Sequence, residues 1–174
     1  MIGSVAANVF RFIGLILLQA MVIDHMDVAH GWITPYLYVL ALLMLPFDVP
    51  AWATLVIGFF TGVVMDFFSG TPGLHTGACT VMAYARGWVL RLVAPRDGYE
   101  FGRRPTVGQM GMAWFLTYAG LLILVHHFWL FFAEVYRFDG FFSTLLRALL
   151  SGLATLALCL LAQGFGPRSV RARA

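Results

Sequence analysis

The chain has 174 residues, of which 61% are hydrophobic and only 11% are charged. A soluble domain carries about a quarter charged residues, so this composition excludes a water-exposed globule and indicates that lipid surrounds most of the chain. The formal net charge is +3, and the sequence contains arginine but no lysine. No polybasic stripe with interleaved polar residues is present, so we expect no nucleic-acid partner.

Six apolar segments follow one another, separated by short breaks rich in turn residues, at about 6–23, 34–45, 51–68, 74–93, 108–133 and 141–165. No cleavage site follows the first segment, which we therefore expect to be an uncleaved transmembrane helix. A helix needs about 20 residues to span a bilayer, so the second segment is short and its depth is open. The pattern predicts a single all-α membrane domain over residues 1–174 with six transmembrane helices.

Arginine placement predicts the orientation of these helices. Cytoplasmic loops of membrane proteins are enriched in basic residues, and an arrangement with both termini inside puts only Arg137 in an outer loop. The polar tail 166–174 would then be cytoplasmic, and the protein would lie in the inner (cytoplasmic) membrane as a multi-pass protein. The arginines expected on the inner side are Arg11, Arg91, Arg96, Arg103, Arg104, Arg168, Arg171 and Arg173.

The third segment carries Gly58, Gly62 and Asp66 at a spacing of four residues. Small residues at this spacing allow a neighbouring helix to approach closely, and Asp66 would face the same contact. A carboxylate inside a membrane protein is normally satisfied by protein groups. Asp66 either caps the following turn or helix, pairs with an arginine of a neighbouring or partner helix, or takes part in a proton or ion relay.

The sixth segment has a polar residue at every fourth position. Each step of four residues turns about 40° around the helix, so the stripe winds and predicts a helix surrounded by protein. The stripe either packs within the bundle or forms a groove for a partner's helix. Arg147 either extends to the membrane surface or meets an acid such as Asp66 or Glu134. The stripe consists of Ser143, Arg147, Ser151, Thr155, Cys159 and Gln163.

Histidines and carboxylates are expected in the outer half of the molecule. There they would form a rim that is either exposed to solvent or in contact with a periplasmic domain. Their spacing matches no metal-ligand motif, so we expect neither a metal nor a cofactor. Cys79 and Cys159 differ too much in depth to form a disulfide. No nucleophile motif, phosphate-binding loop or pair of acids is present, so we expect no enzyme. The polar residues of this half are His25, His30, His75, His126, His127, Asp24, Asp27, Asp66, Glu134 and Asp139.

The passage from Gly62 to His75 contains Asp66 followed by a Ser-Gly-Thr-Pro-Gly73 turn. It resembles the pattern of the MreD family of bacterial rod-shape proteins. The most specific similar string is Pro95-Arg96-Asp97-Gly98-Tyr99-Glu100, in the expected cytoplasmic loop. Further similar stretches are the Asn/Arg-Phe pattern at the start, 35–40 with 45–47, 114–118, 126–127 and 138–146.

This resemblance implies a six-helix fold similar to the substrate-binding S-components of energy-coupling-factor vitamin transporters. It also implies a scaffold that binds MreC and supports lateral peptidoglycan synthesis with MreB, RodA and a class B penicillin-binding transpeptidase. The residues expected to bind partners are Gly58, Gly62, Asp66, Gly73, His75, Arg147 and Ser151. Arg96, Asp97, Tyr99 and Glu100 are expected in the cytoplasmic loop, where arginines would also contact anionic membrane lipids.

Two other classes of function are alternatives. A vitamin-binding transporter subunit requires a polar pocket near the outer face, which the outer histidines and carboxylates would supply. A small integral membrane enzyme is the third interpretation, and it lacks a recognisable catalytic motif. Identification of the proteins that leave the native membrane with this chain separates these classes.

Overall fold

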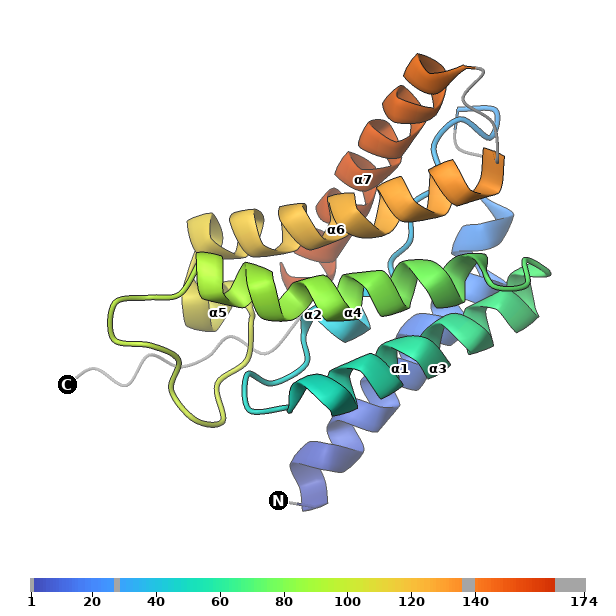
Figure 1. Ribbon diagram of the computed structural model, residues 1–174. Helices are drawn as coiled ribbons and strands as arrows, with labels where there is room; N and C mark the ends of the chain where they lie inside the picture. Colours follow the sequence, from blue (N-terminus) through green and yellow to red (C-terminus); the bar gives the residue numbers. More distant parts are fainter. Residues whose placement is uncertain (1, 27–28, 136–139, 165–174) are drawn as a thin grey trace.

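The computed structural model describes residues 2–26, 29–135 and 140–164 (Figure 1). These ranges contain helices and no strand, as expected for an all-α protein. The predictions for Asp27, Arg137, Asp139 and the tail 166–174 fall outside them. The elements are α1 (Ile2–Met21), the 3-10 helix η1 (Ile23–His25), α2 (Val39–Leu43), α3 (Ala51–Ser69), α4 (Leu74–Leu92), α5 (Val107–Met110), α6 (Met112–Val135) and α7 (Phe141–Gly164).

The long helices form a bundle with two distinct ends (Figure 1). Helix α4 packs against α3 on one side and α6 on the other, and α7 packs on α6. We call the end that carries residues 94–106 the loop end, and the end that carries residues 22–26, 29–32 and 69–73 the turn end. In Figure 1 the loop end is at the left and the turn end at the right.

Proline and glycine set the limits of several helices. Pro50 precedes α3 in an extended conformation, and Gly70 ends that helix in the left-handed region with a φ of 67°. Such a conformation is accessible to glycine at little cost, which makes it the usual residue after a helix. Gly111, with a φ of 87°, breaks the expected fifth helix into the short α5 and the long α6. The prediction of one continuous helix over 108–133 was therefore wrong at its start.

The described part of the chain contains three helices that are long and apolar enough to cross a membrane, namely α3, α6 and α7. Large apolar side chains also cover the outside of the bundle. Phe60 of α3 is 61% exposed, and Phe142 of α7 is 82% exposed. Such surfaces are unfavourable in water and favourable in hydrocarbon. These helices indicate a membrane protein.

The second apolar segment is not the continuous helix predicted for residues 34–45. Residues 33–36 have no regular secondary structure, and only Val39–Leu43 form an α-helix. We call residues 34–46 the central segment, because Tyr36 to Leu43 are buried in the core. It leads toward the loop end, where Phe47 N–H donates to the carbonyl of Arg103 at 3.3 Å. Extended residues advance about twice as far as helical ones, which explains how so short a segment runs along the bundle.

Candidate functional site: a buried polar network around the central segment

The backbone at the start of the central segment is held by side chains of α1 and α7. Gln19 donates to the carbonyl of Pro35 at 3.0 Å and accepts from Leu37 N–H at 2.6 Å. Gln19 is fully buried. Backbone that is not helical must find hydrogen-bond partners inside the protein when no water is available. The amide of Gln19 supplies both a donor and an acceptor, as a paired strand would.

Two hydroxyl groups of α7 complete this part of the network. Ser151 Oγ accepts from Thr34 N–H at 3.0 Å, and Thr155 Oγ1 accepts from Tyr36 N–H at 2.9 Å. Thr155 also lies 3.0 Å from Nε2 of His127. Because His127 Nδ1 donates to the carbonyl of Ile123, its Nε2 is the acceptor and the Thr155 hydroxyl is the donor. Each of these polar groups is thus used within the chain.

Arg86 holds the other end of the central segment. This side chain of α4 is only 4% exposed, and it donates to the carbonyls of Leu45 at 2.6 Å and Pro46 at 3.2 Å. It also donates to the Tyr118 hydroxyl at 3.0 Å, which in turn donates to the carbonyl of Leu43. A buried guanidinium is costly unless its donors are satisfied. Here its donors are used by backbone carbonyls just beyond α2 and by the Tyr118 hydroxyl.

Tyr38 lies at the centre of the buried network. Its hydroxyl is 2.7 Å from Nε2 of His126 and 3.0 Å from Nδ1 of His75, and Cys79 Sγ donates to it at 3.6 Å. The hydroxyl has one proton, so it donates to one imidazole and accepts from the other. His126 Nδ1 is buried without a partner in the described residues. The cluster joins the central segment to α4 and α6.

The side chains of this cluster are not placed to hold a metal ion. The described residues contain no group of three or more His, Cys, Asp or Glu placed to hold a metal ion. Each imidazole has one ring nitrogen directed at the Tyr38 hydroxyl. The geometry suits a hydrogen-bonded tie between three elements, which fixes their positions relative to one another.

Asp66 caps α4. Its carboxylate accepts from the backbone N–H groups of Gly73 at 2.9 Å, His75 at 2.8 Å and Thr76 at 3.0 Å. The hydroxyls of Thr71 and Thr76 donate to it as well. The first N–H groups of a helix lack helical partners, and a negative charge there also interacts favourably with the helix dipole. Of the three interpretations of Asp66, the geometry matches the cap.

Gly58 and Gly62 let α4 approach α3. A methyl group on Gly62 would lie 2.3 Å from Thr76 Cα, and one on Gly58 would lie 2.8 Å from Ala83 Cβ. Only glycine fits such a contact, as the spacing of these residues predicted. The neighbouring helix is α4 of the same chain. Gly58, Gly62 and Asp66 therefore face their own bundle.

The polar stripe of α7 also turns inward for most of its length. Ser151 and Thr155 bind the central segment, Cys159 is buried, and Gln163 accepts from Val107 N–H at 2.8 Å. Arg147 forms a half-exposed ion pair with Glu134 at 3.5 Å, one of the two acids expected for it. Its guanidinium lies over the ring of Phe131 at 4.8 Å. The stripe packs within the bundle from Ser151 onward, whereas Ser143 and Arg147 at its start are accessible.

Some of the histidines expected at the outer face are exposed, and others are buried in the core. His25 and His30 are exposed, whereas His75, His126 and His127 are at most 3% exposed and lie in the core. A rim of five histidines is thus not formed. Of the residues expected to contact partners, Gly73 and Arg147 are accessible, while the others face the chain itself.

The loop at residues 94–106 presents charges on an anchored backbone. Arg96, Asp97 and Glu100 are exposed, and Glu100 pairs with Arg103 at 2.8 Å. Tyr99 instead turns toward the bundle, where its ring stacks on Phe47 at 4.2 Å between centroids. Its hydroxyl donates to the carbonyl of Leu90, and burial raises its pKa. The loop therefore offers a defined charged surface.

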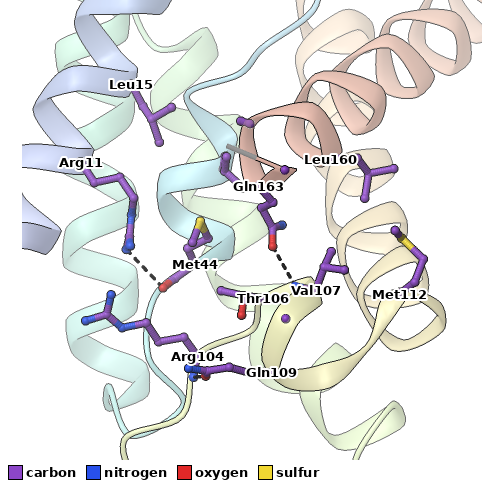
Figure 2. A pocket seen from close by; sticks show the side chains of 14 residues that line it. Arg11, Leu15, Met44, Arg104, Thr106, Val107, Gln109, Met112, Leu160 and Gln163 are labelled. Atoms are coloured by element: carbon purple, nitrogen blue, oxygen red, sulfur yellow. Dashed lines mark hydrogen bonds between the residues drawn. The ribbon is translucent and has the colours of Figure 1, made fainter. Parts of the chain in front are cut away.

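Two pockets lie at opposite ends of the bundle. The turn-end pocket encloses about 410 Å³ and is lined by His30, Trp32, Ser143 and Arg147, among others. The loop-end pocket encloses about 570 Å³ and is lined by residues of α1, α2, α5, α6 and α7 (Figure 2). Neither pocket reaches the Tyr38 cluster, because Tyr38, His75 and His126 line neither of them.

Sequence reasoning missed the residues that serve the central segment. Gln19, Tyr38, Arg86 and Tyr118 were not identified, although an arginine in the middle of an apolar helix is itself a signal. Because Arg86 lies well inside an apolar segment, its side chain must find hydrogen-bond partners inside the protein. The identity of those partners depends on where the central segment lies.

No protein-family model, curated protein or solved structure matches the chain in the three comparisons made.

Proposed function

We propose that the protein is a non-catalytic membrane scaffold of the MreD type. In this function it binds an MreC-like partner and helps to couple cytoplasmic MreB to the RodA and transpeptidase synthase of lateral peptidoglycan. The resemblance of the Gly62–His75 and Arg96–Glu100 strings supports this proposal. The buried polar groups support it as well, because they hold the fold together.

One observation carries the proposal. Three stretches that resemble the family lie far apart in sequence, yet they meet at a single point, where Tyr38, His75 and His126 share one hydroxyl. Asp66 holds the backbone of His75 in place at this point. Residues that are dispersed in sequence and joined in space are expected when a family pattern preserves one architecture.

We propose six passes with both termini on the cytoplasmic side of the inner membrane, in a bundle like that of the S-components. The central segment supplies the second pass as an extended stretch followed by the short α2. The loop end, with Arg96, Arg103 and Arg104, would then face the cytoplasm, as the positive-inside rule favours. Arg147 at the turn end would face the periplasm, beside its partner Glu134.

The accessible residues define the surfaces on which the proposed partners act. Arg147 and Gly73 at the turn end face the side where the periplasmic part of an MreC-like protein lies. Arg96, Asp97 and Glu100 at the loop end face the cytoplasmic components. Gly58, Gly62, Asp66, His75 and Ser151 act on partners only by keeping the bundle in shape.

Co-purification from native membranes tests the scaffold function. We expect an MreC-like protein to leave the membrane with the tagged chain in a mild detergent. Arg147→Gln should reduce the recovered partner severalfold per folded molecule, whereas Arg91→Gln, at an exposed position on α4, should not. Loss of the partner from the wild-type chain, with both proteins intact, contradicts the proposal.

The turn-end pocket favours a second candidate, a vitamin-binding transporter subunit. Its polar lining from His30, Ser143 and Arg147 and its volume of about 410 Å³ suit a small polar ligand. A thermal-shift screen with flavin, thiamine and biotin compounds tests it, since a ligand at a hundred times its Kd stabilises by about 2.7 kcal/mol. A shift that Arg147→Gln abolishes establishes this function in place of the scaffold.

A further inference from the structure

The loop-end pocket has an apolar wall that four helices build together. Leu15 of α1, Leu40 of α2, Met112 of α6 and Leu160 of α7 line it (Figure 2). Helix α1 packs on η1, α2 and α3, whereas α7 packs on α6, so no extensive α1–α7 contact closes the pocket within the described ranges. An apolar cleft of about 570 Å³ between helices of a membrane protein borders on lipid.

The same pocket has positively charged groups at its loop side. Arg11 and Arg104 both line it, and Figure 2 shows their guanidinium groups on the same side, near Met44. Arg11 donates to the Met44 carbonyl at 3.5 Å, and the two arginines repel each other electrostatically. No Asp or Glu is among the described residues that line the pocket, and the ion pairs of the described residues do not use Arg104. An anion beside Arg104 would relieve this repulsion.

Gln163 adds a hydrogen-bond donor that the chain does not use. Its Oε1 accepts from Val107 N–H, which fixes the orientation of the amide (Figure 2). Its Nε2 is buried and has no partner in the described residues. A buried donor without a partner is unfavourable, because it has lost its hydrogen bonds to water. An oxygen of a bound molecule would satisfy it.

We propose that the loop-end pocket binds one anionic phospholipid. The headgroup phosphate interacts with Arg104, Arg11 and Gln163, and an acyl chain lies against Leu15, Leu40 and Leu160. An anionic oxygen matches the guanidinium and amide donors, and a hydrocarbon chain matches the apolar wall. A phospholipid supplies both in one molecule, whereas a soluble phosphate compound leaves the apolar wall empty. This site does not depend on the scaffold function.

Lipid titration of the purified full chain tests the site. The protein in phosphatidylcholine nanodiscs is compared with the protein in nanodiscs that also contain phosphatidylglycerol, and the retained lipid is counted by native mass spectrometry. We expect phosphatidylglycerol to raise the Tm and one molecule to be retained. Loss of one charge-assisted contact in Arg104→Gln should weaken retention roughly tenfold.

The neighbouring arginine provides the matched control. Arg103 is exposed, pairs with Glu100 and does not line the pocket, so Arg103→Gln should retain phosphatidylglycerol like the wild type. Gln163→Glu keeps an acceptor for Val107 N–H and replaces the unused donor by a negative oxygen. It should also lose the lipid, and it replaces Arg104→Gln in the test if that variant does not fold.

Three results overturn the proposal. The first is that Arg104→Gln, or Gln163→Glu in its place, retains as much phosphatidylglycerol as Arg103→Gln. The second is equal stabilisation by phosphatidylcholine and phosphatidylglycerol, because the pocket would then not select an anion. The third is equal stabilisation by inorganic phosphate or glycerol phosphate at the same concentration, which would make the occupant a soluble anion.

Discussion

The Tyr38 hydroxyl lies 2.7 Å from Nε2 of His126, at a point where neither side chain has measurable exposure. The same hydroxyl contacts His75 of α4, so one oxygen atom ties the central segment to α4 and α6. This atom is the basis of the first prediction.

Tyr38→Phe should destabilise the protein by about 1–3 kcal/mol, because it leaves two buried imidazoles without their shared partner. Tyr36→Phe is the control, since the Tyr36 hydroxyl makes no hydrogen bond within the described residues. Thermal unfolding in detergent compares the two variants. Equal melting temperatures would show that the shared hydroxyl does not hold the helices together.

Asp66→Asn should lower stability by about 1–2 kcal/mol, because an amide offers fewer acceptors and no charge to the start of α4. Partner recovery per folded molecule should stay at the wild-type value. Asp48→Asn, which changes an exposed carboxylate, should alter neither quantity. A loss of partner with an unchanged melting temperature would instead assign Asp66 a direct contact.

Gly62→Ala should prevent α3 and α4 from packing, because its methyl group would lie 2.5 Å from the His75 carbonyl oxygen. We expect loss of most folded protein in size-exclusion chromatography. Gly120→Ala in α6 is the matched control, because a methyl group there meets no atom within 4 Å. That change should be neutral or stabilise by up to about 1 kcal/mol. Normal yield of Gly62→Ala contradicts the packing described.

Arg86→Met should cost about 3–5 kcal/mol, since the Leu45 and Pro46 carbonyls and the Tyr118 hydroxyl lose a charged donor. Arg86→Lys should recover only part of this loss, because a point charge does not reproduce the planar fork of arginine. Arg91→Met, on the exposed side of the same helix, is the control. Chemical unfolding measures the three variants, and a wild-type midpoint for Arg86→Met would refute this role.

The sequence allowed the limits of α3, α4 and α7 to be predicted within a residue or two, because Pro50, Gly73 and Gly140 mark them. It did not allow the central segment to be predicted. An apolar run without polar positions has no period that separates a helix from extended chain. The form of residues 34–38 depends on Gln19, Ser151 and Thr155, two of which lie more than 100 residues away.

For the candidate site, the sequence predicted which helix faces make close contacts, but it did not predict what they contact. The Gly58–Gly62 spacing correctly indicated a close helix contact, and the stripe on α7 correctly indicated a helix face against protein. Which protein provides that contact is not encoded in a single helix. Arg86 and Gln19 became interpretable only once the carbonyls and amides they bind had positions.

The hydrogen bonds from Thr34 and Tyr36 to α7 also set an order of events during synthesis. Ser151 and Thr155 are synthesised more than 110 residues after the backbone N–H groups that donate to their hydroxyls. Until α7 has been inserted, those two amides must bind water, lipid headgroups or the insertion machinery. The central segment therefore settles last, although it is translated before α3, α4, α6 and α7. A ribosome-stalled chain that ends before residue 151 should leave residues 34–38 open to proteases.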